Sequence, residues 1–171
     1  MATEKALGIV LTGLGPGADA TVRAFAARGY EVLAAEPGLE NVRAAMAALA
    51  GRKIAVVGYG RGGSDAFLAV TRLGADGAAA FYGAGIGAHL SEAARAVKPL
   101  SLHFGDADER VPFEEVRAIK GALEGFGTTE IYRYPNVGHG FALRGDPGYD
   151  ESAAQDAERR VFSFLESLGG V

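Results

Sequence analysis

The sequence contains no cysteine, which excludes disulfide bonds, thiolate metal sites and a cysteine nucleophile. The absence of cysteine also fits a cytoplasmic protein, and we expect that location. No apolar run approaches the roughly 18 residues that a membrane-spanning helix needs. Residues 1–5 lack the basic region and apolar core of a signal peptide. We therefore expect a protein without a membrane partner.

Basic residues are few and scattered. The 17 lysines and arginines are outnumbered by 21 acidic residues, for a net charge of −4, and they form no basic stripe. We therefore expect no nucleic acid partner. No group of His, Asp and Glu has metal-ligand spacing, so we predict no metal and no other cofactor. The 171 residues include no Pro/Ser-rich linker and no internal repeat, which predicts a single domain over residues 1–171.

Short apolar runs alternate with helical patterns along the whole chain. Most runs are continuously apolar, which is typical of parallel strands buried on both faces. The alternation predicts an α/β fold, with a doubly wound, mostly parallel sheet of about six strands flanked by helices. Ser152 and Gln155 resemble a capping box at the start of the last helix. The predicted strands are 7–12, 31–35, 53–58, 78–82, 100–104 and 129–134, and the predicted helices are 18–28, 41–50, 62–73, 89–97, 113–126 and 152–168.

A glycine-rich turn follows the third predicted strand and leads straight into a helix. Residues 58–63 read Gly-Tyr-Gly-Arg-Gly-Gly, which has the spacing of the strand-turn-helix motif that carries a hydrolase nucleophile. The central residue of that motif is held at positive φ, and side chains two places before and after it would collide. Here the central residue is Gly60, which has no side chain with which to attack a substrate.

An acid and a base follow the last two predicted strands. Asp108 comes after strand 100–104 and His139 after strand 129–134. The chain order of nucleophile position, acid and base is that of α/β hydrolases. Because ligands of such sheets bind outside the carboxyl ends of the strands, we expect Gly60, Asp108 and His139 to meet at one edge. We interpret His103, which lies within a strand, as a hydrogen-bonded interior residue and His89 as the start of a helix.

Together these motifs resemble the dienelactone hydrolase family of α/β hydrolases, over nearly the whole chain from Leu7. The resemblance implies a minimal α/β-hydrolase core in which Asp108 orients His139 and His139 is the general base. It also implies an oxyanion hole made by the backbone N–H groups of Leu14 and Arg61. The matching pieces are 29–34, Val56-Val57-Gly58-Tyr59, Gly62-Gly63, Ala80-Phe81-Tyr82-Gly83, Phe104-Gly105, Asp108, Val111-Pro112, Gly138-His139, Phe141, Tyr149-Asp150 and Ala153-Ala154.

The resemblance further implies a small ester, lactone or carboxylate ligand, for which we expect contacts from Tyr59 and Arg144. With Gly60 at the nucleophile position, we expect weak or no activity as a covalent hydrolase. The alternatives are that Gly60 was introduced into an active hydrolase, or that His139 activates water or abstracts a substrate proton. The chain also lacks the family's leading strands, which leaves the edge strand 31–35 open to pairing in a homodimer.

A nucleotide site is the second functional hypothesis. Gly13, Gly15 and Ala18 follow the first predicted strand with the spacing G-x-G-x-x-A. Glu36 lies about 20 residues further on, where a dinucleotide site places the acid that binds a ribose hydroxyl. This hypothesis leaves the motifs around Asp108 and His139 without a role.

Overall fold

A six-stranded parallel sheet forms the centre of the protein, with strand order β2-β1-β3-β4-β5-β6. The computed structural model describes residues 5–169. The sheet and its strand positions agree with the α/β fold expected from the apolar runs. Strands β2 and β6 are the two edges of this sheet. The strands are β1 (Gly8–Thr12), β2 (Glu31–Ala35), β3 (Ile54–Tyr59), β4 (Gly77–Phe81), β5 (Leu100–Gly105) and β6 (Thr129–Tyr134).

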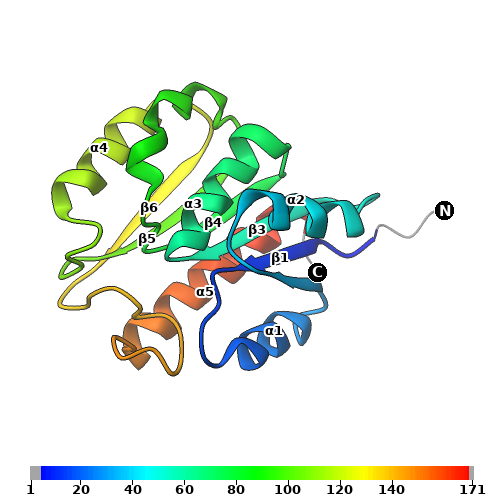
Figure 1. Cartoon of the computed structure of the whole chain (residues 1–171), viewed down its shortest axis with the longest axis horizontal. Helices are drawn as coiled ribbons and strands as arrows, with labels where there is room; N and C mark the ends of the chain where they lie inside the picture. Colours follow the sequence, from blue (N-terminus) through cyan, green and yellow to red (C-terminus); the bar gives the residue numbers. More distant parts are fainter. Residues whose placement is uncertain (1–4, 170–171) are drawn as a thin grey trace.

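Helices cover both faces of the sheet, as Figure 1 shows. On one face, α2, α3, α4 and the turns η1 and η2 contribute side chains to the first hydrophobic core. On the other face, α1 and α5 close the second core. No helix among residues 5–169 is long and apolar enough to cross a membrane. The helices are α1 (Ala18–Ala26), α2 (Leu39–Ala48), α3 (Arg61–Leu68), the π-helical η1 (Ala69–Leu73), the 3₁₀-helical η2 (Ile86–Arg95), α4 (Phe113–Leu123) and α5 (Glu151–Ser167).

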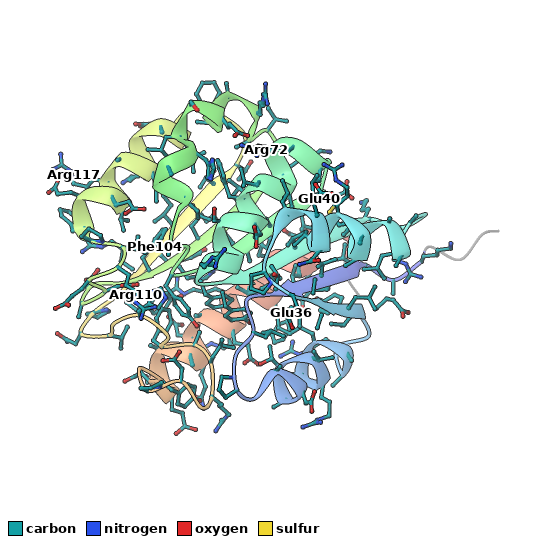
Figure 2. The ribbon with its side chains drawn as sticks, in the orientation of Figure 1. Glu36, Glu40, Arg72, Phe104, Arg110 and Arg117 are labelled. Atoms are coloured by element: carbon teal, nitrogen blue, oxygen red, sulfur yellow. The ribbon has the colours of Figure 1, made fainter. Side chains whose placement is uncertain are left out.

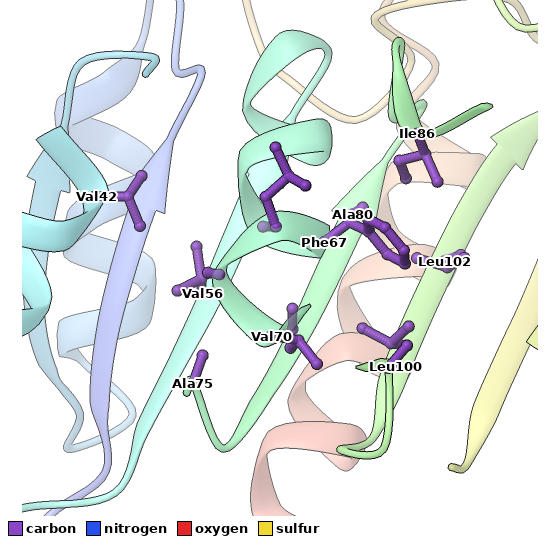
Figure 3. Packing of buried hydrophobic residues seen from close by; sticks show 14 of the residues in the cluster. Val42, Val56, Phe67, Val70, Ala75, Ala80, Ile86, Leu100 and Leu102 are labelled. Atoms are coloured by element: carbon purple, nitrogen blue, oxygen red, sulfur yellow. The ribbon is translucent and has the colours of Figure 1, made fainter. Parts of the chain in front are cut away.

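Side chains alternate between the two cores along each central strand. In β3, Val56 belongs to the first core and Val57 to the second, and both are fully buried. Phe67 points from α3 toward Ala80 and Leu102 of the neighbouring strands, as Figure 3 shows. The two-sided burial explains why the strands read as continuous apolar runs. This packing fixes α3, and therefore the turn that precedes it, against the middle of the sheet.

Three helical predictions need correction. The helix predicted over 62–73 is α-helical only to Leu68 and continues as a π turn to Leu73, after which Gly74 takes a left-handed conformation. His89 does not start a helix, because it lies inside η2 with non-helical backbone angles. The proposed capping box is also wrong. Asp150 is the N-cap of α5, and its side chain accepts a hydrogen bond from the Ala153 N–H at 2.9 Å.

Candidate active site

The turn between β3 and α3 has the backbone geometry that the glycine motif predicts. Gly60 has φ 57° and ψ −119°, outside the regions that residues with a side chain ordinarily occupy. Two hydrogen bonds hold it there. The Gly60 N–H donates to the Phe81 carbonyl at 3.0 Å, and the Gly60 carbonyl accepts from the Gly63 N–H at 2.9 Å. The turn therefore holds Gly60, which has no side chain, in a strained conformation.

The glycines around this turn are required by close backbone approach. A Cβ atom on Gly58 would overlap the carbonyl oxygen of Gly62, and a Cβ atom on Gly62 would overlap the carbonyl oxygen of Thr12. Gly13 is equally confined, since its Cβ atom would overlap the carbonyl oxygen of Tyr59. The segment after β1 thus lies directly against the turn, which places the neighbouring Leu14 beside it.

Asp108 and His139 form a hydrogen-bonded pair at the carboxyl ends of β5 and β6. His139 Nδ1 lies 2.9 Å from Asp108 Oδ2. The other carboxylate oxygen accepts from the N–H groups of Arg110 at 2.8 Å and Val111 at 3.2 Å. Arg110 is labelled in Figure 2, just beyond Phe104 of β5. Because the carboxylate accepts the Nδ1 proton, Nε2 of the neutral imidazole is left as a free acceptor.

This free nitrogen faces the turn. A Cβ atom built on Gly60 would lie 3.4 Å from His139 Nε2, an ordinary contact distance. The Asp108 side chain is fully buried, whereas 20% of the His139 side chain is exposed, so a ligand can reach His139 from solvent. The structure therefore brings together Gly60, Asp108 and His139, as the chain order predicts.

Tyr82 is a residue of this site that the sequence did not single out. It directly follows β4, and its ring packs against the His139 imidazole with centroids 4.8 Å apart. Its backbone has φ 41°, an uncommon value for a residue with a large side chain. Its place in the Ala80-Phe81-Tyr82-Gly83 piece is the only signal the sequence offers. The Tyr82 ring holds one side of the imidazole in place.

The two backbone N–H groups that we expected to form an oxyanion hole, those of Leu14 and Arg61, lie at the turn. Arg61 is the first residue of α3, so its N–H has no acceptor within the helix. The Leu14 N–H donates to no other group within residues 5–169. The helix N-terminus also adds a partial positive charge at this point. These groups are suited to receive a carbonyl oxygen that gains negative charge.

The structure places Tyr59 and Arg144 away from this arrangement. Tyr59 is buried on the α1–α5 face, where its ring stacks on that of Phe81 at 4.6 Å. Arg144 is exposed and lies beside Glu151, with 3.7 Å between their charged atoms. Both residues line a small cavity to which neither Asp108 nor His139 contributes.

His103 has the interior position that we expected. It is completely buried in β5, with Nε2 2.9 Å from Ser101 Oγ and Nδ1 2.9 Å from the Tyr134 hydroxyl. Burial lowers the pKa of His103 to about 3, so the ring is neutral at ordinary pH. Its hydrogen bond with Tyr134 links β5 to β6. Among residues 5–169, no three side chains of His, Asp or Glu are grouped as ligands for a metal ion.

Comparison with known proteins agrees with the family resemblance noted in the sequence. The dienelactone hydrolase family matches this chain over residues 20–169. A carboxymethylenebutenolidase from Pseudomonas putida is 34% identical over 119 residues, which are 68% of this chain and 49% of that protein. Another, from Pseudomonas sp. (strain P51), is 27% identical over 155 residues, covering 88% of this chain and 65% of that protein. The chain thus spans about half the length of the first of these relatives.

Solved structures share the fold at low sequence identity. A dienelactone hydrolase-like promiscuous phosphotriesterase from metagenomic libraries has a TM-score of 0.82 and 18% identity, over 98% of this chain and 88% of that one. Esterase 2 from Thermogutta terrifontis has a TM-score of 0.75 and 20% identity, over 98% of this chain and 83% of that one. At this identity the likeness concerns the fold alone.

Proposed function

The chain belongs to the dienelactone hydrolase family, and we propose that its site binds a small ester or lactone and hydrolyses it slowly without an acyl-enzyme. The observation that carries this proposal is that His139 Nε2 is free and faces Gly60, the one residue at the centre of the turn, which has no side chain. A Cβ atom on Gly60 would lie 3.4 Å from that nitrogen. The volume that a nucleophile's side chain would fill beside the base is therefore open to a water molecule.

The proposed reaction uses groups already in position. The substrate carbonyl oxygen accepts hydrogen bonds from the Leu14 and Arg61 N–H groups. Water attacks the carbonyl carbon while His139 Nε2 takes its proton, and Asp108 stabilises the imidazolium that forms. When the tetrahedral intermediate collapses, the C–O bond of the leaving group breaks and the alkoxide takes the proton back from Nε2. Without covalent catalysis the rate stays low, because binding and the oxyanion hole supply only a remnant of a triad's acceleration.

The test is hydrolysis of 4-nitrophenyl acetate by four matched proteins. We expect weak turnover by the unsubstituted chain that falls to background in His139→Ala. Gly60→Ser restores a hydroxyl beside Nε2 and should raise kcat/KM by a factor on the order of 10² or more. Gly60→Ala adds the same Cβ without the hydroxyl and should show no such rise. If folded Gly60→Ser is no faster than Gly60→Ala, the dyad is not aligned with the turn and the proposal fails.

The nucleotide hypothesis receives no support from the family match or the similar proteins described above. The structure also gives Gly13 a different reason to be glycine, since its Cβ atom would overlap the carbonyl oxygen of Tyr59. A glycine there is needed by the turn that carries Gly60, whether or not a phosphate is ever bound. We therefore do not propose nucleotide binding.

A further inference from the structure

A small cavity of about 120 Å³ lies on the α1–α5 face of the sheet. Figure 1 shows these two helices on the side opposite to α2, α3 and α4. The cavity is bounded by α1, the last residues of β3 and β4, the segment after His139, and α5. Gly60, Asp108 and His139 do not line it, so this cavity is separate from the proposed hydrolytic site.

Aromatic side chains form the floor of the cavity, and small side chains line its walls. Tyr59 and Phe81 stack with an angle of 2° between their rings, and they are only 4% and 3% exposed. Phe25 of α1 completes the aromatic surface, and Ala24 and Ala154 line the sides. Such a surface favours a flat apolar ring, because rings pack well in offset or edge-to-face contact with other rings.

One polar group of this floor, the Tyr59 hydroxyl, is accessible from the cavity, since it is not among the fully buried polar atoms that lack a partner. The Tyr59 hydroxyl makes no hydrogen bond with any group among residues 5–169. By contrast, the buried Tyr134 hydroxyl is hydrogen-bonded to His103. Burial, and then the charge of Glu158 at the cavity wall, raise the pKa of Tyr59 above its ordinary value. The hydroxyl therefore stays neutral and can both donate and accept.

We propose that this cavity binds a neutral monocyclic phenol or an aromatic alcohol of the same size. This volume of about 120 Å³ is below that of a dry cavity of about 150 Å³ that holds one benzene molecule, so no more than one ring can enter, with part of it at the open mouth. Because Tyr59 and Phe81 stack on each other, the ring of the ligand contacts the parts of these rings that line the cavity, and its hydroxyl pairs with the Tyr59 hydroxyl. A ligand hydroxyl can replace water at the Tyr59 hydroxyl, whereas a plain hydrocarbon would leave that hydroxyl without a partner, so the phenol gains affinity over the hydrocarbon.

The charges around the cavity argue against an anionic ligand. Glu158 is close enough to the Tyr59 hydroxyl to affect its pKa, and it would repel a carboxylate placed there. The single cation at the wall, Arg144, lies beside Glu151 and over the Tyr149 ring at 5.4 Å. Its charge is therefore already balanced at the surface, and a neutral hydroxyl compound is the better fit.

The test is an NMR titration of the full chain with phenol, toluene and benzoate to about 10 mM, the range of a weak ligand of this size. We expect phenol to give saturable shifts at Ala24, Ala142 and Gln155, and benzoate to bind more weakly than phenol. Tyr59→Phe should weaken phenol binding about tenfold and leave toluene within about twofold, since only a hydrogen bond is lost.

Filling the cavity gives the second arm of the test. Ala24→Leu should abolish binding of both phenol and toluene. Ala47→Leu adds the same bulk to an exposed position of α2 on the other face and should bind phenol like the unsubstituted chain. Thermal melts confirm that each variant is folded. No saturable shift, shifts confined to His139 and Gly60, tighter binding of benzoate than of phenol, or equal phenol affinity in Tyr59→Phe would each overturn the proposal.

Discussion

Replacing Gly60 by alanine isolates the strain of the turn from its chemistry. The Gly60 backbone, at φ 57° and ψ −119°, is held by hydrogen bonds to Phe81 and Gly63 and cannot relax without breaking them. A Cβ atom meets only His139 Nε2, at the ordinary distance of 3.4 Å. The substitution therefore adds backbone strain and almost no steric overlap.

The expected cost follows from two opposing contributions. A residue with a side chain in such a conformation costs about 1–3 kcal/mol. Alanine also restricts the unfolded chain, which favours folding by about 0.4–1 kcal/mol. We therefore expect Gly60→Ala to lower the free energy of unfolding by about 1–2 kcal/mol.

Urea unfolding measures this difference in unfolding free energy when both proteins show the same dependence of that free energy on urea concentration. The matched control is Gly121→Ala in α4, an exposed glycine whose Cβ would meet no atom within 4 Å. There the same substitution should raise the free energy of unfolding by about 0.5–1 kcal/mol, as expected for a helix interior. An unchanged or increased stability of Gly60→Ala would refute the claim that the turn holds Gly60 in a strained conformation.

Three further predictions concern other parts of the fold. Gly58→Ala should destabilise the protein by about 3 kcal/mol or more in urea unfolding, because its Cβ would overlap backbone rather than a movable side chain; a smaller loss means that the turn yields easily. Asp150→Ala should cost about 1 kcal/mol of unfolding free energy, since it removes the cap of α5, and an unchanged midpoint would show that another group caps the helix. Buried His103 has a folded pKa of about 3 against an ordinary 6.5, so the unfolded chain takes up the proton first and stability falls as pH drops below about 6.5. At pH 5 the loss of unfolding free energy from this residue is about 2 kcal/mol relative to neutral pH. Urea unfolding at several pH values should show that this contribution disappears in His103→Asn. Identical pH profiles for the two proteins would contradict the lowered pKa of His103.

Much of the fold is predictable because parallel strands buried on two faces leave a strong apolar signal. The ends of all six strands lie within one residue of the ends of the predicted runs. The π turn after Leu68 and the 3₁₀ form of η2 were not predicted, because both depend on how the helices meet the sheet. Asp150 was missed as the cap of α5, since Ser152 offered an equally good local pattern.

Some residues of the candidate site could be predicted from the sequence, and others could not. Gly60, Asp108 and His139 could be placed together from chain order, since parallel strands end at one edge. The orientation of Tyr59 could not be predicted from the turn motif alone. Side chains alternate along β3, so Tyr59 shares the face of Val57 and points to the α1–α5 side. Only the full packing shows that this face holds a separate cavity.

The most direct test of the central claim is covalent labelling of Gly60→Ser with an alkyl fluorophosphonate, read by intact mass. If the acid, base and turn are aligned, the Ser hydroxyl attacks phosphorus, fluoride leaves and His139 takes the proton. We predict one adduct on Gly60→Ser, none on the unsubstituted chain, and none on the double variant Gly60→Ser with His139→Ala. A folded Gly60→Ser that stays unlabelled, or labels equally well without His139, would contradict the account.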